Sequence, residues 1–360
     1  MRRPLRTGRG VAIMTVVALV VFIGRALWAN GLFASVPTGF AGSCKTQASV
    51  PGIEDMEAAG GKVFVAVASA RGPDGRDGIY VIKDGKLSKL AGTPKDFHPR
   101  GISIYHGPGG SLFLFAVNRR SSGASAGAGA TNAKVRFSID SFEIAAGDNP
   151  ALTPQGTIEG GLLTDPQDVA AAGPGAFYVS NNSAKSNLTK QLAGYGVLPA
   201  SEVLYFNGMT FKSVADGLYG ARGLVLAPDG THLLVASLTT RSIKSFDRNV
   251  FSGALTEADS LTLAAAPEKL SLDSYGQVWA AGHANLFHWR AFAADPKARD
   301  TSQVFRVSLL NGAPQDSSQI YGSRGSDGKE IAAASVAVSS AQGLLIGSSL
   351  DNKLLNCTAK

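Results

Sequence analysis

One pattern of polar and apolar positions recurs six times along the chain. Each copy has a short polar or charged lead, a brief alternating strand, a turn and a strongly apolar strand. Alternation with a period of two predicts half-buried strands, and short strands repeated at this spacing are typical of propeller blades. The six copies therefore predict an all-β, six-bladed β-propeller. Their leading residues recur at intervals of 46 to 67 residues and are Glu54-Asp55-Met56, Arg100-Gly101-Ile102, Gln167-Asp168-Val169, Arg222-Gly223-Leu224, Glu268-Lys269-Leu270 and Ala334-Ser335-Val336.

The segments between these strands also favour a propeller. Pro228-Asp229-Gly230 and Ser274-Tyr275-Gly276 stand where hairpin turns would join the first and second strands of two blades. Glycine makes up 43 of the 360 residues, which is well above the usual level and fits many tight turns. No helical period of useful length separates the strands, which argues against a parallel α/β fold. Because the innermost strands of a propeller converge, we expect the leading residues to face one another at one mouth of a central channel.

The N-terminus has the layout of an export signal. Four arginines precede the apolar run Val11–Ile23, and apolar residues resume after Arg25 as far as Ala34. Val11–Ala34 is long enough to span a membrane, although Val11–Ile23 alone is short for this. We predict that residues 1–43 form an uncleaved signal anchor and that residues 44–360 form the propeller, outside the cytoplasm in the periplasm or extracellular space. A cleaved signal and a buried terminal helix are the alternatives.

The charge distribution narrows the range of partners. The chain carries a formal net charge of +7, but the arginines before residue 44 account for +5 of it. A nucleic-acid-binding domain would have its basic excess on the folded part, so we expect no nucleic-acid partner. A hydrophobic content of 44% excludes a mainly disordered chain.

Three further segments carry expectations of their own. Cys44 and Cys357 are the only cysteines and bracket the predicted propeller, so a disulfide between its first and last strands is the simplest interpretation, with two unpaired thiols as the alternative. Residues 121–130 read SSGASAGAGA, which predicts a flexible linker or a lid over the channel. The polar segment Asn181–Gly196 is a second candidate for an element at the channel rim.

The sequence lacks the common local motifs of serine hydrolases, zinc proteases, P-loop proteins and dinucleotide-binding proteins. It has instead an ordered series of stretches: Gly52–Glu57, Phe97–Ser103, Val117-Asn118, Pro166–Pro174, Ala227–Gly230 and Leu345–Gly347. In these stretches the chain resembles the paraoxonase/arylesterase family of six-bladed, calcium-dependent lactonases and esterases, over roughly Cys44 to Cys357. It is more distantly similar to gluconolactonase-like and strictosidine-synthase-like propellers. The cysteine pair also matches the disulfide of the family.

The resemblance implies a structural calcium ion in the channel. The two aspartates and the backbone carbonyl that bind it in the family correspond to Asp55, Asp168 and Ile102. Carboxylate and carbonyl oxygens are the hard ligands that Ca²⁺ prefers. The alternative is that both aspartates only accept hydrogen bonds from backbone amides.

The catalytic calcium of the family has a less complete counterpart. Glu54 is kept, whereas Gln167 and Glu268 replace a shorter asparagine and a shorter aspartate. Arg222 and Lys269 replace two further asparagines, and neither can ligate a metal while charged. Both would also repel a dication at close range. We expect these two cations to take the place of the metal by forming ion pairs with Glu54 and Glu268.

The two activating histidines of the family correspond here to Arg100 and Arg119, while His283 aligns with a histidine near the pocket. A guanidinium cannot serve as a general base near neutral pH, but it can bind an anion or stabilise an oxyanion. We therefore expect a positively charged mouth that suits a small ligand carrying a carboxylate or phosphate.

Three functions are compatible with these residues. The first is hydrolysis of lactones or aryl esters, with Glu54 and Glu268 as acid/base candidates and Arg100 or Arg222 as oxyanion stabiliser. The second is a binding propeller without chemistry, which holds an anionic small molecule or a protein. The third is another reaction that uses an unpaired glutamate as the base. Likeness of fold alone does not decide among them.

Overall fold

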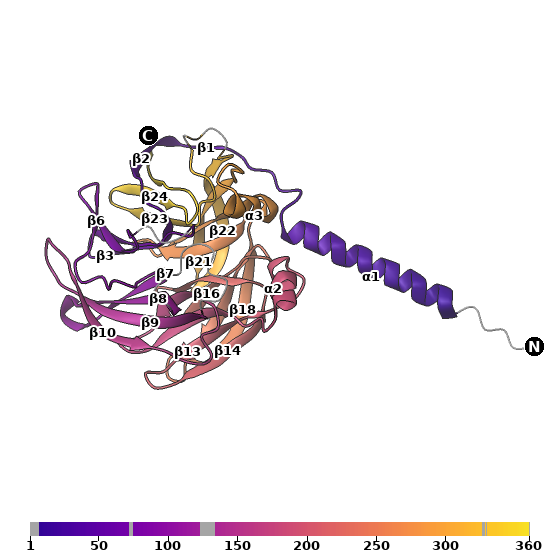
Figure 1. Cartoon of the computed structure of the whole chain (residues 1–360), viewed down its shortest axis with the longest axis horizontal. Helices are drawn as coiled ribbons and strands as arrows, with labels where there is room; N and C mark the ends of the chain where they lie inside the picture. The colour runs from indigo at the N-terminus through magenta and orange to yellow at the C-terminus, as the bar shows by residue number, and fades with distance from the viewer. Residues whose placement is uncertain (1–6, 72–74, 123–133, 326–327, 329, 360) are drawn as a thin grey trace, which may run out of the picture.

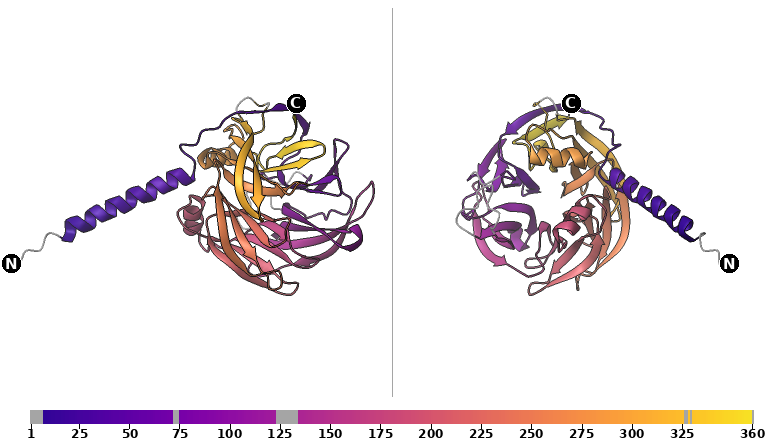
Figure 2. Two further views of the ribbon diagram at one scale, coloured as in Figure 1. Left: turned by 180° about the vertical axis from the view of Figure 1, so that it is seen from behind. Right: turned by 45° about the vertical axis from the view of Figure 1, so that its right-hand side comes forward.

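The computed structural model describes residues 7–71, 75–122, 134–325, 328 and 330–359. Six antiparallel sheets surround a common centre, and the right-hand view of Figure 2 shows them as a ring. The predicted six-bladed β-propeller is confirmed. A long helix projects from one side of the ring (Figure 1).

The first strand of each blade, which lies innermost, carries one of the six leading residue groups. Blade one contains β3 (Ile53–Ala59), β4 (Lys62–Val67), β5 (Gly78–Lys83) and β6 (Lys86–Lys89). Blade two contains β7 (Pro99–His106), β8 (Leu112–Ser122), β9 (Lys134–Ile144) and β10 (Leu152–Ile158), with the 3-10 turn η1 (Pro108–Gly110) between β7 and β8. Blade three contains β11 (Pro166–Ala171), β12 (Phe177–Asn182), β13 (Ser201–Phe206) and β14 (Phe211–Leu218).

The remaining three blades follow in chain order. Blade four contains β15 (Ala221–Leu226), β16 (His232–Ser237), β17 (Ser242–Arg248) and β18 (Leu255–Thr262). Blade five contains β19 (Ala266–Leu272), β20 (Val278–His283), β21 (Ser302–Leu310) and β22 (Ala313–Ser323), with β1 (Gly39–Phe40) at its outer edge. Blade six contains β23 (Val336–Ser340), β24 (Gly343–Gly347), β25 (Leu354–Ala359) and β2 (Gly42–Ala48).

The ring is closed by the N-terminal part of the chain. Strand β2 pairs with β25 so that Cys44 lies directly opposite Cys357, and the two cysteines form a disulfide. The predicted link between the two ends is therefore confirmed. Adjacent blades pack through apolar side chains, for example Phe115 of blade two against Phe177 of blade three, with ring centroids 5.4 Å apart. Burial of each such side chain contributes about 2–3 kcal/mol.

Helix α1 (Thr7–Ala29) leaves its apolar side chains exposed. Its stretch Gly10–Ala29 is long and apolar enough to cross a membrane, and a signal sequence has the same properties. The alternative of a buried terminal helix does not fit this exposure. At the propeller end of α1, the Arg25 guanidinium lies 4.7 Å from the centre of the Tyr219 ring. Just beyond the helix, the Asn30 side chain donates to the carbonyl of Tyr195 at 3.0 Å.

Two short helices lie between propeller strands, where the sequence indicated no helix of useful length. Helix α2 (Asn187–Gly194) follows β12, and helix α3 (Leu286–Ala294) follows β20. Both are capped by side chains, α2 by Ser186 and α3 by Asn285. Periodicity did not reveal them because eight or nine residues hold only about two helical turns. The segment Asn181–Gly196 thus contains α2, while residues 123–130 of the low-complexity segment lie outside the described part.

Candidate functional site at the upper mouth

We call the end of the channel where the innermost strands begin the upper mouth and the opposite end the lower mouth. Helices α2 and α3 follow β12 and β20 at the upper mouth. The first two strands of five blades shift register there, between Ile53 and Asp55, Pro99 and Ile102, Pro166 and Asp168, Ala221 and Leu224, and Pro267 and Lys269. The residues at these bulges include Glu54, Arg100, Gln167, Arg222 and Glu268. Bulges re-aim side chains, so consecutive residues such as Glu54 and Asp55 escape strict alternation between opposite faces.

Arg100 is held by an acidic residue that lies outside the repeat. Its Nη1 donates to Oδ1 of Asp165 at 2.7 Å and to the carbonyl of Pro166 at 3.0 Å. The Asn182 side chain donates to the other carboxylate oxygen of Asp165 at 2.9 Å. Burial raises the pKa of Asp165, but the charge of Arg100 and these hydrogen bonds outweigh it and lower the pKa. Asp165 therefore stays ionised and fixes the guanidinium at the mouth.

Arg222 and Gln167 form the next contact around the mouth. The Arg222 Nη1 donates to Oε1 of Gln167, whose Nε2 donates to the carbonyl of Asp165 at 2.9 Å. The Gln167 side chain thus links Arg222 to the backbone of Asp165, and the Asp165 carboxylate in turn binds Arg100. The expected ion pair between Arg222 and a glutamate is not among the ion pairs of the described residues, because the amide of Gln167 takes this position.

Glu54 is the half-buried carboxyl of this group. Within the described chain, its side chain has no hydrogen-bond or ion-pair partner. Burial and the charge of Glu268 raise the pKa of Glu54, while the charges of Arg100, Lys269 and Arg222 lower it, and the result is a pKa of about 7. A carboxyl in this state can gain or lose a proton near neutral pH.

Glu268 has a different partner from the one expected. Its Oε2 lies 2.6 Å from Nε2 of His283, and Nδ1 of His283 lies 3.2 Å from Oδ2 of Asp300. Burial lowers the pKa of His283, but its two carboxylate partners outweigh this effect and raise it to about 9. For Glu268 the directions are reversed. Burial raises the pKa of this carboxyl, but its contact with protonated His283 outweighs burial and brings the pKa below its usual value. His283 is fully buried beneath Trp289 of α3, so it supports Glu268 from behind.

Lys269 lies deeper in the channel. Its Nζ is 3.2 Å from Oδ1 of Asp168 and 3.9 Å from Oδ2 of Asp55, and it donates to the carbonyl of Gln167 at 2.8 Å. The predicted pairing of Lys269 with Glu54 or Glu268 is thus replaced by a pairing with the two aspartates. The reason is its place after the bulge at Glu268, from which the long side chain reaches across the channel from blade five to blades one and three.

The same geometry tests the expected calcium ligands. The Asp55 carboxylate accepts from the backbone amides of Met56 and Ile102, at 2.9 and 2.8 Å. The Asp168 carboxylate accepts from those of Val169 and Leu224, both at 2.9 Å. A dication between the carboxylates would meet the Lys269 ammonium at close range.

These residues therefore do not fit a calcium ion in this arrangement, and the contacts match the alternative in which the aspartates accept backbone amides. No group of three or more histidine, cysteine, aspartate and glutamate side chains among the described residues is arranged to hold a metal.

Two residues at this mouth change the predicted charge balance. Asp165 and Asp300 stand outside the leading positions of the repeat, so the pattern did not single them out, although Asp165 directly precedes the Pro166 that opens β11. Together they offset Arg100 and protonated His283. Arg119 is exposed on β8 and contributes no ion pair within the described part of the chain. The mouth consequently lacks the positive excess that the leading residues predicted.

The fold and this ring of polar groups place the chain among six-bladed propellers whose chemistry-bearing residues gather at one mouth of the channel. A family model described as arylesterase matches residues 36–358, and the chain belongs to the arylesterase, or paraoxonase, family. This membership supports a hydrolase-like function at the level of the family.

Individual relatives are similar at moderate identity. Serum paraoxonase/arylesterase 2 of Gallus gallus is 28% identical over 64% of this chain and 61% of its own length. The protein of the same name from Homo sapiens is 26% identical over the same shares. The chain thus spans about three fifths of the length of these relatives.

Solved structures show the same fold at low identity. A luciferin-regenerating enzyme superposes with a TM-score of 0.53 at 10% identity and covers 88% of this chain and 95% of its own. A candidate gluconolactonase superposes with a TM-score of 0.51 at 16% identity and covers 91% of this chain and 98% of its own.

Proposed function

We propose that this chain hydrolyses lactones or aryl esters at the upper mouth, with Glu54 as the acid/base residue. The observation that carries the proposal is the position of the Glu54 carboxyl. It is unpaired and half-buried, and it lies close enough to Arg100 and Arg222 for their charges to lower its pKa. A general base beside fixed cationic donors is the arrangement that ester hydrolysis requires. The pKa of about 7 supports this role, because it leaves a substantial ionised fraction at neutral pH.

The reaction follows from these groups. Ionised Glu54 accepts a proton from a water molecule while the water oxygen forms a bond to the acyl carbon. The electron pair of the carbonyl moves onto its oxygen, and N–H groups of Arg100 or Arg222 stabilise the resulting oxyanion. When the oxyanion collapses, the bond to the leaving oxygen breaks, and Glu54 returns its proton to that oxygen. A lactone gives a hydroxy acid, and an aryl ester gives an acid and a phenol.

The two glutamates take separate roles in this proposal. Glu268 stays ionised because protonated His283 binds it, and its negative charge helps to raise the pKa of Glu54. Two carboxyl groups whose pKa values are driven apart is the usual arrangement for an acid/base pair. Glu268 and His283 are therefore positioning residues for Glu54. Gln167 keeps the Arg222 guanidinium directed along the mouth.

Substitution of Glu54 tests the proposal. The whole chain is purified in detergent and assayed with phenyl acetate and δ-valerolactone. We expect Glu54→Gln to reduce kcat/KM by about 10²–10⁴, the usual contribution of a general base. Glu159→Gln is the matched control, because Glu159 is exposed on the surface. Turnover by Glu54→Gln within about twofold of the unmodified chain, with an unchanged melting temperature, would rule out Glu54 as the base.

We also propose that α1 anchors the propeller to a membrane and that the propeller lies outside the cytoplasm, in the periplasm or extracellular space. The disulfide supports this location, because disulfides persist in oxidising compartments. Protease added to cells whose outer envelope has been removed and whose cytoplasmic membrane is intact should digest the propeller. A propeller that is protected until the cytoplasmic membrane is broken would contradict the orientation.

A further inference from the structure

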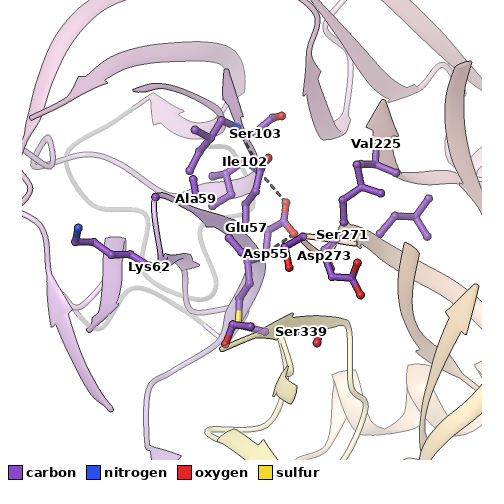
Figure 3. A pocket seen from close by; sticks show the side chains of 18 of the residues that line it. Asp55, Glu57, Ala59, Lys62, Ile102, Ser103, Val225, Ser271, Asp273 and Ser339 are labelled. Carbon is purple, nitrogen blue, oxygen red and sulfur yellow. Dashed lines mark hydrogen bonds between the residues drawn. The ribbon is translucent and has the colours of Figure 1, made fainter. Parts of the chain in front are cut away.

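A cavity of about 560 Å³ opens at the lower mouth, at the opposite end of the channel from Glu54. Its walls are the innermost strands beyond the Lys269 level and the hairpin turns that follow them, including those at Gly60-Gly61, Asp273-Ser274 and Ala341-Gln342. Figure 3 shows the carboxyl group of Glu57, from β3, near the centre of this space, with Val225 and Ser271 on the facing side. The cavity thus has a polar group inside a wall drawn from several blades.

Most of the wall is apolar. Ile104, Val225, Leu226 and Leu272 line it from three different blades. Small ligand sites commonly combine such walls with a few placed polar groups. The wall therefore suits a compact hydrocarbon body rather than an extended polar molecule.

Glu57 places a carboxyl group in the cavity with no basic side chain beside it. Burial raises the pKa of Glu57 to about 8, so the carboxyl is ionised above this pH, and a bound cation favours its ionised form. Its Oε2 accepts from the backbone amide of Ile104 at 2.7 Å, and it has no ion pair with a basic side chain among the described residues. Lys62 stands at the rim, but Figure 3 shows its ammonium pointing away from Glu57. The charge of Lys62 acts on Asp148 instead. The backbone amide of Ile104 and the Ser103 side chain therefore hydrogen-bond the Glu57 carboxyl, and neither carries a positive charge.

A second carboxyl group adds to the negative field. Asp273 lines the cavity and accepts from the backbone amides of Tyr275 and Gln277 and from the Trp279 indole, at 2.9 to 3.0 Å. The other basic side chain on this wall, His106, is exposed. Along the described wall the carboxyl groups thus outnumber the ammonium groups. A cation is therefore favoured over an anion, and most strongly where Glu57 is ionised.

We propose that the lower cavity binds a small organic ammonium ion with a compact apolar body, with Glu57 as the carboxyl that pairs with the ammonium. The apolar body would lie against Ile104, Leu226 and Leu272. A neutral alcohol of the same shape would gain the apolar contacts and an uncharged hydrogen bond but no ion pair, and an anion would be repelled by the ionised carboxyl groups of Glu57 and Asp273. This site is separate from the proposed hydrolytic site, because the layer of Asp55, Asp168 and Lys269 lies between them.

Three adamantane derivatives of one shape test the proposal by calorimetry on the whole chain at pH 8.5, above the pKa of about 8 of Glu57. They are 1-adamantanamine as the cation, 1-adamantanol as the neutral analogue and 1-adamantanecarboxylate as the anion. We expect the amine to bind at least about tenfold more tightly than the alcohol, the gain from one charge-assisted hydrogen bond, and the carboxylate to bind most weakly. Equal affinities for amine and alcohol, or tighter binding of the carboxylate, would overturn the proposal before any variant of the protein is tested.

Variants then locate the bound amine. Glu57→Gln should weaken amine binding at least about tenfold and leave alcohol binding unchanged, while Lys62→Gln, the rim control, should not weaken amine binding. Unchanged amine affinity in a folded Glu57→Gln protein would overturn the assignment. Saturating amine should also leave phenyl acetate turnover unchanged in the unmodified chain. Competitive inhibition would place the amine at the upper mouth and overturn the proposal. If the unmodified chain shows no hydrolysis, the proposed function fails, but the calorimetric test of the lower cavity remains valid.

Discussion

The ammonium of Lys269 lies 3.2 Å from a carboxylate oxygen of Asp168, in the middle of the propeller channel. Lys269 belongs to blade five and Asp168 to blade three, so this contact spans the channel. Both side chains are at most 6% exposed. The contact puts a fixed positive charge next to the two aspartates that the family resemblance assigned to calcium, and it separates the upper mouth from the lower cavity.

Removal of the Lys269 charge should change the response of the protein to calcium. Loss of one partner from a buried ion pair typically costs about 3–5 kcal/mol, so Lys269→Asn should be destabilised by about this amount without calcium. Calcium should then raise the melting temperature of Lys269→Asn but not that of the unmodified chain, since a ligand stabilises only the state that binds it.

Lys244→Asn is the control for this experiment, because Lys244 pairs with Glu257 on an outer strand, where a lost pair costs about 0–1 kcal/mol. The measurement is thermal unfolding with calcium and with a chelator. An equal rise in melting temperature for the unmodified chain would show that Lys269 does not exclude the ion.

The pH dependence of hydrolysis should report on Glu54. A general base must be ionised, and the pKa of Glu54 is raised to about 7. We expect kcat/KM for δ-valerolactone to rise about tenfold per pH unit below pH 6 and to level off above pH 8. A rate that is constant between pH 5.5 and 8 would contradict a base with this pKa.

His283 should make the stability of the fold depend on pH. Its pKa is raised from 6.5 to about 9 in the folded state, so the stabilisation is complete below pH 6.5 and is lost as the pH rises through 9. Glu54 and Glu57 also have raised pKa values, of about 7 and 8. The folded state therefore also loses stability as the pH rises through this range, because these buried carboxyl groups must then ionise. Comparison with a variant is therefore needed to isolate the histidine.

Urea unfolding of His283→Gln at pH 6, 7, 8 and 9 provides this comparison. The variant should be less stable at pH 6 and should lose less free energy of unfolding between pH 6.5 and 9 than the unmodified chain. His106→Gln, which alters an exposed histidine, should follow the unmodified chain. Equal slopes for His283→Gln and the unmodified chain would show that His283 is not protonated in the folded protein.

Gly101 allows blades two and three to approach closely. A Cβ atom at this position would lie 1.9 Å from Oδ1 of Asp168 and 2.5 Å from its Cα. Gly101→Ala should therefore lower the free energy of unfolding by about 1–3 kcal/mol, the usual cost of overpacking. Gly175→Ala is the matched control, because no atom lies within 4 Å of the corresponding Cβ. Denaturant unfolding measures both, and equal stabilities would show that the backbone shifts without cost.

Much of the fold could be predicted because its signals are local. Alternation of apolar and polar residues marks strands wherever one face is buried, and the six leading groups mark the innermost strand of each blade. The pairing of Cys44 with Cys357 followed from their positions at the two ends of that repeat. Helices α2 and α3 did not follow, because each is too short to show a period.

The candidate site could be predicted only as a set of residues. The leading positions predicted that Glu54, Arg100, Gln167, Arg222, Glu268 and Lys269 gather around the channel, and in the structure Arg222 contacts Gln167 while Lys269 reaches Asp168. Their partners depend on bulges in the strands and on the reach of long side chains, which no local pattern encodes. Asp165 and Asp300, which hold Arg100 and His283, occupy no repeated position at all.

By itself, the sequence determined the strands, the number of blades and the two cysteines at the ends, because these depend on neighbours along the chain. The tertiary structure alone decided that Lys269 contacts Asp168 and Asp55, that His283 binds Glu268, and that Glu57 enters a separate cavity. The physical reason is that six strands from distant parts of the chain converge on one axis, where the charges and lengths of side chains from different blades determine which groups meet.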